Sequence, residues 1–377
     1  MDNWIAHQII LLIFLMFPLS IALWNSVTYR HLGDYRVMPR TPKVSVLVPA
    51  RNEEGNIEQC IGSLLEQEYP DFQVIALDDN STDGTWRVLE KLAARNDRLT
   101  LVKGKPLPKG WLGKHWACHQ LALIATGELL LFTDADTCHK PQALRHAVSA
   151  LLSEDAGLLS VLPHQQVRSW AERLAIPVVW WSIFSFLPLA LAYRLKAPCL
   201  SFANGQFMLF SRHSYELIGG HAAVKNTVVD DLALVRNIKS ANLRWRILDG
   251  KNYVRCRMYR NFRQVVDGLS KNLFAAFDYN IPVYVFIWLW LGLVFIEPPA
   301  VILSAFLGFG TSSFSTVVAW STIAVSLFLW MLSYRQFHFP LWQVLLYPIT
   351  ISFFILIALR SMAVTLSGKR LWKERTI

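Results

Sequence analysis

The stretch Glu128-Leu129-Leu130-Leu131-Phe132-Thr133-Asp134-Ala135-Asp136 joins an apolar run, typical of a buried strand, to two carboxylates at its end. Residues 72–79 repeat this arrangement, because the run that ends at Leu77 is followed by Asp78 and Asp79. In an open α/β sheet, ligands bind in the crevice at the carboxyl ends of the strands. We therefore expect both acidic clusters to face one crevice, where a divalent cation that holds a diphosphate would offset the repulsion between the carboxylates.

The region around these clusters alternates short apolar runs with helical patterns. The predicted strands cover residues 44–48, 72–77, 99–102 and 128–133, and two of the predicted helices cover 115–125 and 141–152. This alternation is the signature of a parallel sheet with crossover helices. The sequence thus predicts an α/β, Rossmann-like domain over residues 40–260.

The two ends of the chain are apolar. Hydrophobic residues make up 53% of the 377 residues and charged residues only 17%, which points to the bilayer. Residues 9–24 carry no charge and predict a span within an anchor over residues 1–28; a cleavable signal peptide is disfavoured because no positive charge precedes the span and no small-residue cleavage site follows it. Further apolar stretches at 281–309, 315–333 and 341–359 predict a membrane block over 281–366, followed by a basic tail over 367–377.

Positive charges set the expected orientation. The first span is followed by Arg30, Arg36, Arg40 and Lys43. We therefore expect the middle of the chain at the cytoplasmic side of a bacterial inner membrane. Four complete spans would place the basic residues 369–373 on the opposite side, against the positive-inside rule. A shallow or re-entrant last stretch, which Pro340 and Pro348 would permit, removes the conflict, and both arrangements stay open.

Two further segments have the character of the membrane surface. Residues 174–195 are rich in aromatic side chains and flanked by arginines, which predicts a helix in the interface; the alternative is a buried core helix. Residues 261–280 carry one apolar stripe and predict a second interface helix. The formal charge of +10 favours attraction to anionic membrane lipids, and no nucleic-acid-binding pattern is present.

Four motifs occur in a fixed order along the middle of the chain. They are Val48-Pro49-Ala50-Arg51-Asn52-Glu53, Asp78-Asp79-Asn80-Ser81-Thr82-Asp83-Gly84-Thr85, Asp134-Ala135-Asp136 and Asp230-Asp231. In order and spacing they resemble the family 2 glycosyltransferases with their GT-A fold. The resemblance implies an inverting transfer of a sugar from a nucleotide-sugar donor, with Mg²⁺ or Mn²⁺ at the diphosphate.

The resemblance also implies roles for the residues near the donor. Asp136 corresponds to the direct metal ligand, and Asp134 to a contact with the ribose or the metal shell, with Ala135 between them. Asp78 corresponds to the carboxylate that reads the nucleobase, and Asp79 shares this role or orients the loop. The remaining donor-binding candidates are Pro49, Ala50, Arg51 and Glu53 under the nucleotide and Lys114 at the diphosphate.

Asp231 corresponds to the family's catalytic base, which takes the acceptor's proton as the acceptor attacks the anomeric carbon. Asp230 can cap the helix that follows. We expect the acceptor region to include Gly205, Gly219, Gly220, His221 and Asp230. A plain turn at the two adjacent glycines is the alternative.

A narrower resemblance covers nearly the whole chain. Four segments, Gly110–Cys118, Ala203–Phe210, Ile218–His221 and Val228–Asp231, are similar to the carotenoid-glycosylating branch, which includes diaponeurosporenoate glycosyltransferases and carotenoid 2′-O-glycosyltransferases. The Gln-x-x-Arg-Trp motif of processive synthases is absent after Asp231, which favours a single transfer. The expected acceptor is a hydroxyl or carboxyl of a carotenoid. A polyprenyl phosphate, a hopanoid or another membrane lipid is the alternative acceptor, and a nucleotide-sugar-binding membrane scaffold is the non-enzymatic alternative.

Overall fold

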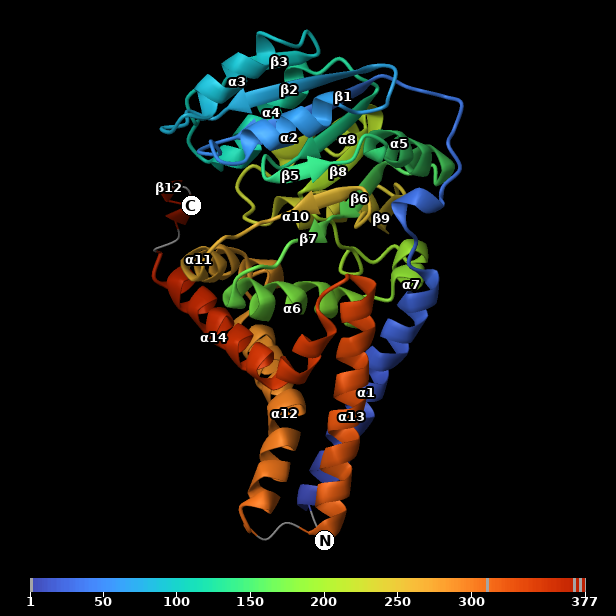
Figure 1. Cartoon of the computed structure of the whole chain (residues 1–377), viewed down its shortest axis with the longest axis vertical. Helices are drawn as coiled ribbons and strands as arrows, with labels where there is room; N and C mark the ends of the chain where they lie inside the picture. Colours follow the sequence, from blue (N-terminus) through green and yellow to red (C-terminus); the bar gives the residue numbers. More distant parts are fainter. Residues whose placement is uncertain (1–2, 310–311, 369–370, 373–374, 377) are drawn as a thin grey trace.

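The chain forms an α/β domain and a stem of long apolar helices, with α6 (Trp170–Phe186) and α11 (Phe262–Asn272) between them (Figure 1). The structure is a computed structural model that describes residues 3–309, 312–368, 371–372 and 375–376. In the predicted basic tail, Lys369, Arg370 and Lys373 lie outside the described residues. The described part of the tail pairs β11 (Leu371–Trp372) with β12 (Arg375–Thr376).

Seven strands form the main sheet, in the order β3-β2-β1-β4-β8-β6-β9. They are β1 (Val44–Ala50), β2 (Phe72–Asp78), β3 (Leu99–Lys103), β4 (Leu129–Thr133), β6 (Leu158–Leu162), β8 (Phe207–Ser211) and β9 (Trp245–Asp249). The four predicted strands are confirmed. β1 pairs in parallel with β2 and with β4, and Ala50 is level with Asp78. The carboxyl ends of these three strands therefore meet at one edge of the sheet.

The prediction of a purely parallel sheet is wrong for β8. This strand pairs antiparallel with both β4 and β6, and its first residue, Phe207, is level with Thr133 at the end of β4. The chain enters β8 from residues 204–206, which lie at the same edge as the acidic clusters. A strand that starts at that edge must run away from it, so its direction opposes that of β4. The sheet is mixed.

Helices cover both faces of this sheet, which explains why its strands are apolar on both sides. Val46 belongs to one core with Ile61, and the next residue, Leu47, belongs to another core with Leu121. The elements around the sheet are α2 (Ile57–Leu65), α3 (Thr85–Ala93), α4 (Gly113–Ile124), α5 (Ala143–Ser153), α8 (Arg212–Leu217), α9 (Gly220–Ala223), α10 (Asp230–Ser240) and the 3₁₀ turn η1 (Leu32–Asp34). The predicted helices 115–125 and 141–152 correspond to α4 and α5.

A small second sheet connects the acidic edge to the membrane side. It has the order β5-β10-β7, formed by β5 (Thr137–His139), β10 (Val254–Cys256) and β7 (His164–Gln165). β5 follows directly after Asp136, and β10 pairs antiparallel with it. Residues 257–260, which follow β10, are thereby held next to the acidic edge.

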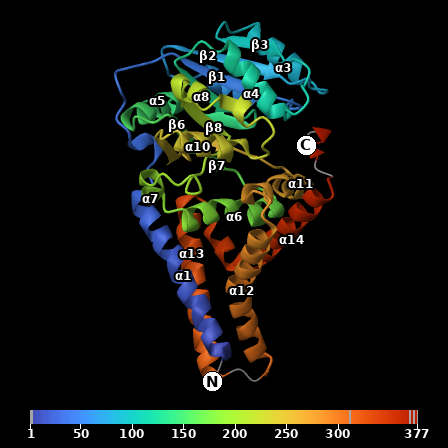
Figure 2. The same cartoon turned by 180° about the vertical axis from the view of Figure 1, so that it is seen from behind.

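Within the residues that the structure describes, the stem contains four helices that are long and apolar enough to cross a membrane. They are α1 (Asn3–Thr28), α12 (Ile281–Phe306), α13 (Ser313–Gln336) and α14 (Tyr347–Leu366) with the preceding 3₁₀ segment η3 (Leu341–Leu346). α1 packs along α13, and both views show the two helices side by side (Figures 1 and 2). The end of α12 and the start of α13 lie at the end of the stem farthest from the sheet (Figure 1).

The last apolar stretch begins and ends on the side of the α/β domain. At its start, the carbonyl oxygen of Gln336 accepts a hydrogen bond of 2.8 Å from Lys251 beside the main sheet. At its end, the hydroxyl of Ser361 donates a bond of 2.6 Å to the carbonyl oxygen of Ser270 in α11. Between these points, Tyr347 contacts Phe295 midway along α12, with ring centroids 5.9 Å apart. Residues 337–366 therefore enter the stem and return to the level of α11.

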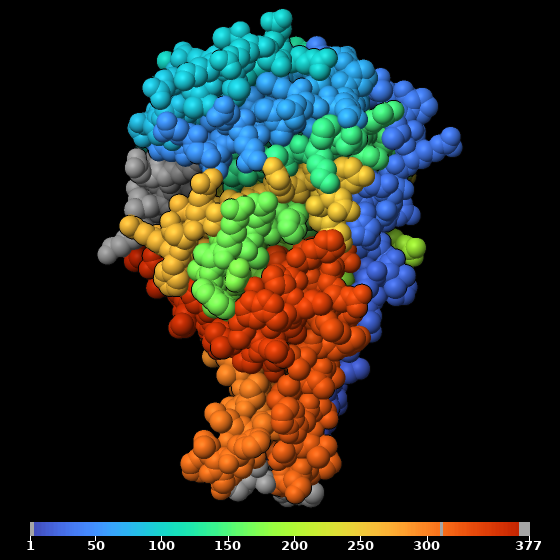
Figure 3. Space-filling model, viewed as in Figure 1, coloured from blue at the N-terminus to red at the C-terminus, as the bar shows by residue number. Residues whose placement is uncertain are grey.

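The single helix expected over residues 174–195 is two helices, α6 and α7 (Leu189–Arg194). Pro188 lies at the break, because proline has no N–H to donate and restricts the residue before it. α6 lies across the top of the stem, under the α/β domain (Figure 3). Its Trp181 is fully buried and stacks on Trp330 of α13, with ring centroids 4.5 Å apart, whereas Trp170 at its start is exposed. The segment expected over 261–280 contains α11 and the 3₁₀ turn η2 (Ala275–Phe277).

Candidate active site

A cavity of about 560 Å³ lies at the carboxyl ends of β1 and β4. Twelve of the predicted site residues line it: Pro49, Ala50, Arg51, Glu53, Asp79, Lys114, Asp134, Ala135, Asp136, Gly205, Asp230 and Asp231. Four predicted residues, Asp78, Gly219, Gly220 and His221, are not among its lining residues. The cavity thus gathers carboxylates from segments that are more than 150 residues apart in the sequence.

The loops after β1 and β2 are joined by hydrogen bonds. The guanidinium of Arg51 donates to the carbonyl oxygens of Asp79 and Asn80, at 2.6 and 2.8 Å. Asn52 and Asn80 adopt the left-handed conformation, with φ of 51° and 55°, which asparagine tolerates better than most residues. In this way Arg51 fixes the loop of Asp79 against the floor formed by Pro49 and Ala50.

Asp78 lies behind the cavity wall. It is 5% exposed, and its Oδ2 atom accepts a bond of 3.3 Å from the backbone N–H of Ser81. Its Oδ1 atom is buried without a hydrogen-bond partner. Asp79 is 2% exposed and lines the cavity. Of the adjacent pair, Asp79 is the one at the cavity surface.

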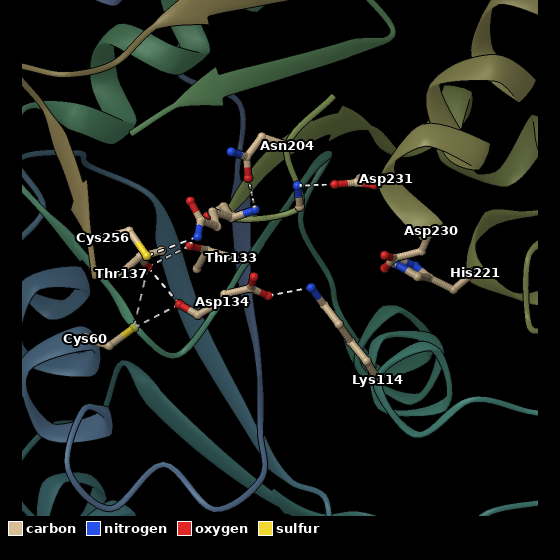
Figure 4. Close-up of polar contacts among 12 residues, drawn as sticks. Cys60, Lys114, Thr133, Asp134, Thr137, Asn204, His221, Asp230, Asp231 and Cys256 are labelled. Atoms are coloured by element: carbon tan, nitrogen blue, oxygen red, sulfur yellow. Dashed lines mark hydrogen bonds and ion pairs between the residues drawn. The ribbon is translucent and has the colours of Figure 1, made fainter. Parts of the chain in front are cut away.

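The turn at residues 134–136 is held by its neighbours (Figure 4). The hydroxyl of Thr137 donates to the carbonyl oxygen of Asp134 at 2.7 Å, and the side chain of Thr133 donates to the carbonyl oxygen of Gln206 at 2.8 Å. The Oδ1 atom of Asp134 is 2.6 Å from the ammonium nitrogen of Lys114, which comes from α4. Burial alone would lower the pKa of Lys114, but Asp134 and Asp230 raise it well above its ordinary value, so the side chain is charged.

The carboxylates of this turn fit a divalent cation. Burial, together with the charges of Asp134 and Glu53, raises the pKa of Asp136 to about 7. The Oδ1 atom of Asp136 is buried without a hydrogen-bond partner, and a cation would satisfy it. Within residues 3–309 and 312–368, no three His, Cys, Asp or Glu side chains form a cluster able to hold a metal ion by themselves. A cation here would need further oxygen ligands from a bound group, as Mg²⁺ commonly takes from phosphates.

Asp231 lies in the first turn of α10, directly after Asp230, and points across the cavity towards the turn before β8. Its Oδ2 atom accepts a bond of 3.0 Å from the backbone N–H of Gly205 (Figure 4). Its Oδ1 atom accepts one of 2.7 Å from the N–H of Leu232. A Cβ atom on Gly205 would lie 3.4 Å from the Lys114 nitrogen and 3.5 Å from Oδ2 of Asp231. Gly205 therefore lies in the gap between Lys114, the candidate diphosphate ligand, and Asp231, the candidate base.

The two adjacent aspartates of α10 have opposite electrostatic environments. Burial, followed by the negative charge of Asp230, raises the pKa of Asp231 to about 6. Burial also acts on Asp230, but its neighbours, the charged Lys114 first among them, outweigh burial and lower the pKa of Asp230 below its ordinary value. At neutral pH both groups are ionised, and Asp231 is the one that binds a proton more readily. This combination suits a general base beside a permanently charged carboxylate.

Gly219, Gly220 and His221 form a packed turn behind Asp230. Gly219 and Gly220 have φ of 75° and 50°, and a Cβ atom on Gly220 would lie 2.5 Å from the ring of Tyr215. His221 is 2% exposed, its Nδ1 atom is 2.8 Å from the hydroxyl of Tyr215, and its Nε2 atom is 4.0 Å from Asp230. Burial lowers the pKa of His221 to about 3, so the ring is neutral. These residues support Asp230 from outside the cavity.

The wall on the membrane side contains residues that sequence reasoning did not assign. Gln264, Gly268 and Lys271 of α11 line the cavity. Their spacing of four and then three residues puts them on one face of the helix, opposite the apolar stripe that identified the helix. This polar face of the helix is the sequence signal that could have identified these three residues as part of the cavity. Burial and the neighbouring charge of Lys114 lower the pKa of Lys271 to about 8.

Residues 257–260 complete this wall, and two arginines fix it. The guanidinium of Arg257 lies 3.1 Å from the carboxylate of Glu172, which is 1% exposed and caps the start of α6. Arg260 donates to the side chain of Asn56 and, at 3.4 Å, to the carbonyl oxygen of Gly55. The wall therefore connects the membrane-side helices directly to the loop after β1.

Comparison with known proteins agrees with this architecture. Residues 45–219 match the family described as glycosyl transferase family 2. The 4,4′-diaponeurosporenoate glycosyltransferase of Staphylococcus haemolyticus is 27% identical over 263 residues, which cover 67% of this chain and 66% of the relative. The enzyme of the same name from Staphylococcus aureus strain USA300 is 28% identical over 242 residues, 61% of this chain and 60% of the relative. The match thus spans slightly less than two thirds of either relative.

Among solved structures, the mannosyltransferase PcManGT of Pyrobaculum calidifontis, determined with GDP-Man and Mn²⁺, superimposes with a TM-score of 0.60. It is 20% identical and the superposition covers 97% of both chains, so the whole architecture, stem included, has a precedent. The predicted GT-A fold with apolar helices at both ends is confirmed. By sequence, the chain resembles the family 2 glycosyltransferases and, within them, the 4,4′-diaponeurosporenoate glycosyltransferases, and its fold is of the GT-A kind.

Proposed function

We propose that this protein is an inverting glycosyltransferase that moves a sugar from a nucleotide-sugar donor to an apolar acceptor in the membrane, with a carotenoid hydroxyl or carboxyl as the preferred acceptor. One observation carries the proposal: Asp134, Asp136 and Asp231 line a single cavity whose opposite wall belongs to α11, beside the stem. The names of the curated relatives support the acceptor class, and the solved neighbour's GDP-Man and Mn²⁺ support the donor class and the metal.

The donor side of the cavity lies along β1, β2 and β4. Arg51 and Asp79 shape the nucleotide end, and Lys114 provides a positive charge for the diphosphate. Asp134 and Asp136 would hold Mg²⁺ or Mn²⁺, which neutralises charge on the departing diphosphate. The ion pair between Lys114 and Asp134, 2.6 Å long, supports this assignment because it brings a cation next to the proposed metal ligands.

The acceptor side is formed by Asp231, Gly205 and α11. The acceptor oxygen attacks the anomeric carbon from the face opposite the diphosphate, its proton passes to Oδ2 or Oδ1 of Asp231, and the bond from the sugar to the diphosphate breaks. The N–H groups of Gly205 and Leu232 hold the carboxylate in place for this transfer. Attack from the opposite face inverts the configuration of the anomeric carbon.

We further propose that the α/β domain lies at the cytoplasmic face of the inner membrane, with α1, α12 and α13 crossing the bilayer. The stretch 337–366 would be re-entrant, because both of its ends contact elements on the side of the α/β domain. This arrangement returns the basic tail to the cytoplasmic side and satisfies the positive-inside rule.

A second acceptor class has one observation in its favour. Arg257, Arg260 and Lys271 all line the membrane-side wall, and this cationic wall suits an anionic head such as a polyprenyl phosphate. A phosphate acceptor is already deprotonated and needs little help from a base. The two classes therefore differ in how strongly turnover depends on Asp231.

The test is expression of the gene in carotenoid-producing bacteria, followed by mass spectrometry of pigments and lipids. We expect a glycosylated carotenoid with the wild-type chain and none with Asp136→Asn or in membranes treated with a chelator. Unchanged pigments together with a glycosylated polyprenyl phosphate would support the second class. Unchanged pigments and lipids, with no hydrolysis of any nucleotide sugar by the purified protein, would favour the non-enzymatic scaffold.

A further inference from the structure

A second cavity lies far from the active site, where α1 meets α7 and β9. Its volume is about 240 Å³, and its charged and tyrosine lining residues are Arg30, Tyr35, Glu154, Tyr193, Arg194 and Arg246. None of these residues lines the cavity of the candidate active site. The proposed sugar transfer therefore does not account for this cavity.

The lining has a net positive charge of two, since three guanidinium groups face one carboxylate. Glu154 neutralises part of it: its Oε1 atom accepts from Arg30 at 3.0 Å and its Oε2 atom accepts from Arg246 at 2.7 Å. Arg194 forms no ion pair within residues 3–309 and 312–368, and its side chain is exposed. The cavity thus presents a guanidinium that its own carboxylate does not engage.

The two engaged arginines are held in fixed orientations. The guanidinium of Arg246 lies over the ring of Tyr193, 4.6 Å from its centroid, and that of Arg30 lies 5.6 Å from the ring centroid of Tyr35. A planar guanidinium that is fixed in this way matches the oxygens of a phosphate better than a mobile ammonium does. The cavity is preorganised for an anion of this shape.

Its position is at the proposed membrane surface. Thr28, the last residue of α1, lines the cavity, and α7 is joined to α1 by a 3.2 Å bond from the backbone N–H of Leu189 to the side-chain oxygen of Asn25. Large apolar side chains are exposed next to it on both helices, namely Trp24 and Val27 on α1 and Leu191 and Leu195 at α7. Figures 1 and 2 both show α7 at the end of α1 that faces the α/β domain. A basic cavity beside apolar helix surface has the two parts that a phospholipid needs.

We infer that this cavity binds the phosphate of an anionic phospholipid headgroup, while the acyl chains lie against the exposed apolar residues of α1 and α7. The lipid would fix the β9 edge of the α/β domain to the bilayer. This inference rests on the membrane arrangement proposed above and is independent of the sugar-transfer chemistry.

The test measures lipid binding to the purified full-length chain in neutral detergent, by native mass spectrometry. The probes are phosphatidylglycerol and phosphatidylcholine with identical acyl chains, each in competition with inorganic phosphate. The variant is Arg194→Gln, and the matched control is Arg95→Gln, which removes an equal charge from an exposed site between α3 and β3; β3 is the edge strand opposite β9. Thermal melting of both variants verifies that they remain folded.

We expect Arg194→Gln to weaken phosphatidylglycerol binding about tenfold, a difference of about 1.4 kcal/mol, and Arg95→Gln to leave it unchanged. Arg194→Lys should restore part of the affinity. Equal binding by wild type and Arg194→Gln would overturn the inference, as would an equal loss in the Arg95→Gln control, which would indicate diffuse attraction. Binding of phosphatidylcholine as tight as that of phosphatidylglycerol would show that the site does not select the anionic headgroup. Displacement of the lipid by inorganic phosphate at similar concentration would show that the site binds phosphate and does not select a lipid.

Discussion

At the scale of single residues, Asp231 is the group on which the proposed chemistry depends. Asp231→Asn keeps the size of the side chain but removes the atom that binds the proton. With a hydroxyl acceptor we expect turnover to fall by about 10² to 10⁴, the usual contribution of a general base, with little change in donor affinity. Transfer to the acceptor and donor binding are measured separately, and Asp155→Asn, at an exposed carboxylate outside the cavity, is the control. Nearly full turnover in Asp231→Asn would instead indicate an acceptor that is already anionic.

The pH dependence of the reaction follows from the same residue. Burial and the neighbouring Asp230 raise the pKa of Asp231 to about 6, and a base works only when it is deprotonated. The rate should therefore fall as the pH drops through about 6 and level off as the pH rises from that value towards 8. Asp230→Asn removes the nearby negative charge, so it should lower the pKa of Asp231 and move the acidic limb to lower pH. A flat profile of kcat/KM between pH 5 and 8, or a limb that does not move in Asp230→Asn, would contradict this assignment.

At the scale of elements, the contribution of α11 to the cavity leads to a prediction about Lys271. Burial and the charge of Lys114 lower the pKa of Lys271 to about 8, so its positive charge is present below that pH and lost above it. If this charge serves the reaction, activity should decline as the pH rises through about 8. Lys271→Arg should remove that alkaline limb, because arginine stays charged, and Lys271→Met should reduce turnover at least tenfold at neutral pH by leaving the cavity carboxylates less well balanced. Wild-type rates in Lys271→Met would exclude α11 from the reaction.

The elements also show what a sequence can and cannot predict. β1, β2, β3 and β4 were predictable because apolar runs of strand length end at turn residues or carboxylates, and parallel strands bring such ends to one edge. The reversed direction of β8 was not predictable, since it depends on where the chain returns after residues 163–206. The break at Pro188 had a local signal in the proline itself.

The residues of the candidate site also fall into two groups, those that the sequence predicted and those that it did not. The carboxylates that line the cavity were predicted from motifs whose order resembles a family, and the structure brings those of residues 79, 134, 136, 230 and 231 together. Lys271 and Arg257 were not assigned, because each belongs to a segment that the sequence identifies only by its apolar pattern or its charge. Their position depends on packing between α11, α6 and the small sheet, which is long-range information.

At the scale of the whole molecule, the stem links the cavity to the bilayer through one continuous apolar core. Leu47 of β1, Trp181 of α6 and Trp330 of α13 all belong to the same cluster of buried residues. A sheet strand and a stem helix are thus held by shared packing, and the α/β domain has a fixed orientation relative to the stem. The proposed sidedness of the membrane can therefore be tested from a few surface positions.

Cysteine labelling provides that test. Cys199 is exposed, and three of the other four cysteines are buried, so an impermeant maleimide should react chiefly with Cys199. In a Cys199→Ser background, Ser313→Cys reports the far end of the stem and Ser367→Cys reports the end of α14; both positions are exposed. We expect Cys199 and Ser367→Cys to react in inverted membrane vesicles but not in intact spheroplasts, and Ser313→Cys to show the opposite pattern. The reason is that residues 337–366 return to α11, where Ser361 bonds to Ser270, so the tail and the active site share one side. Reaction of Ser367→Cys in intact spheroplasts would mean that the last stretch crosses the bilayer completely, and the contacts of α14 with α11 could then not exist in the membrane.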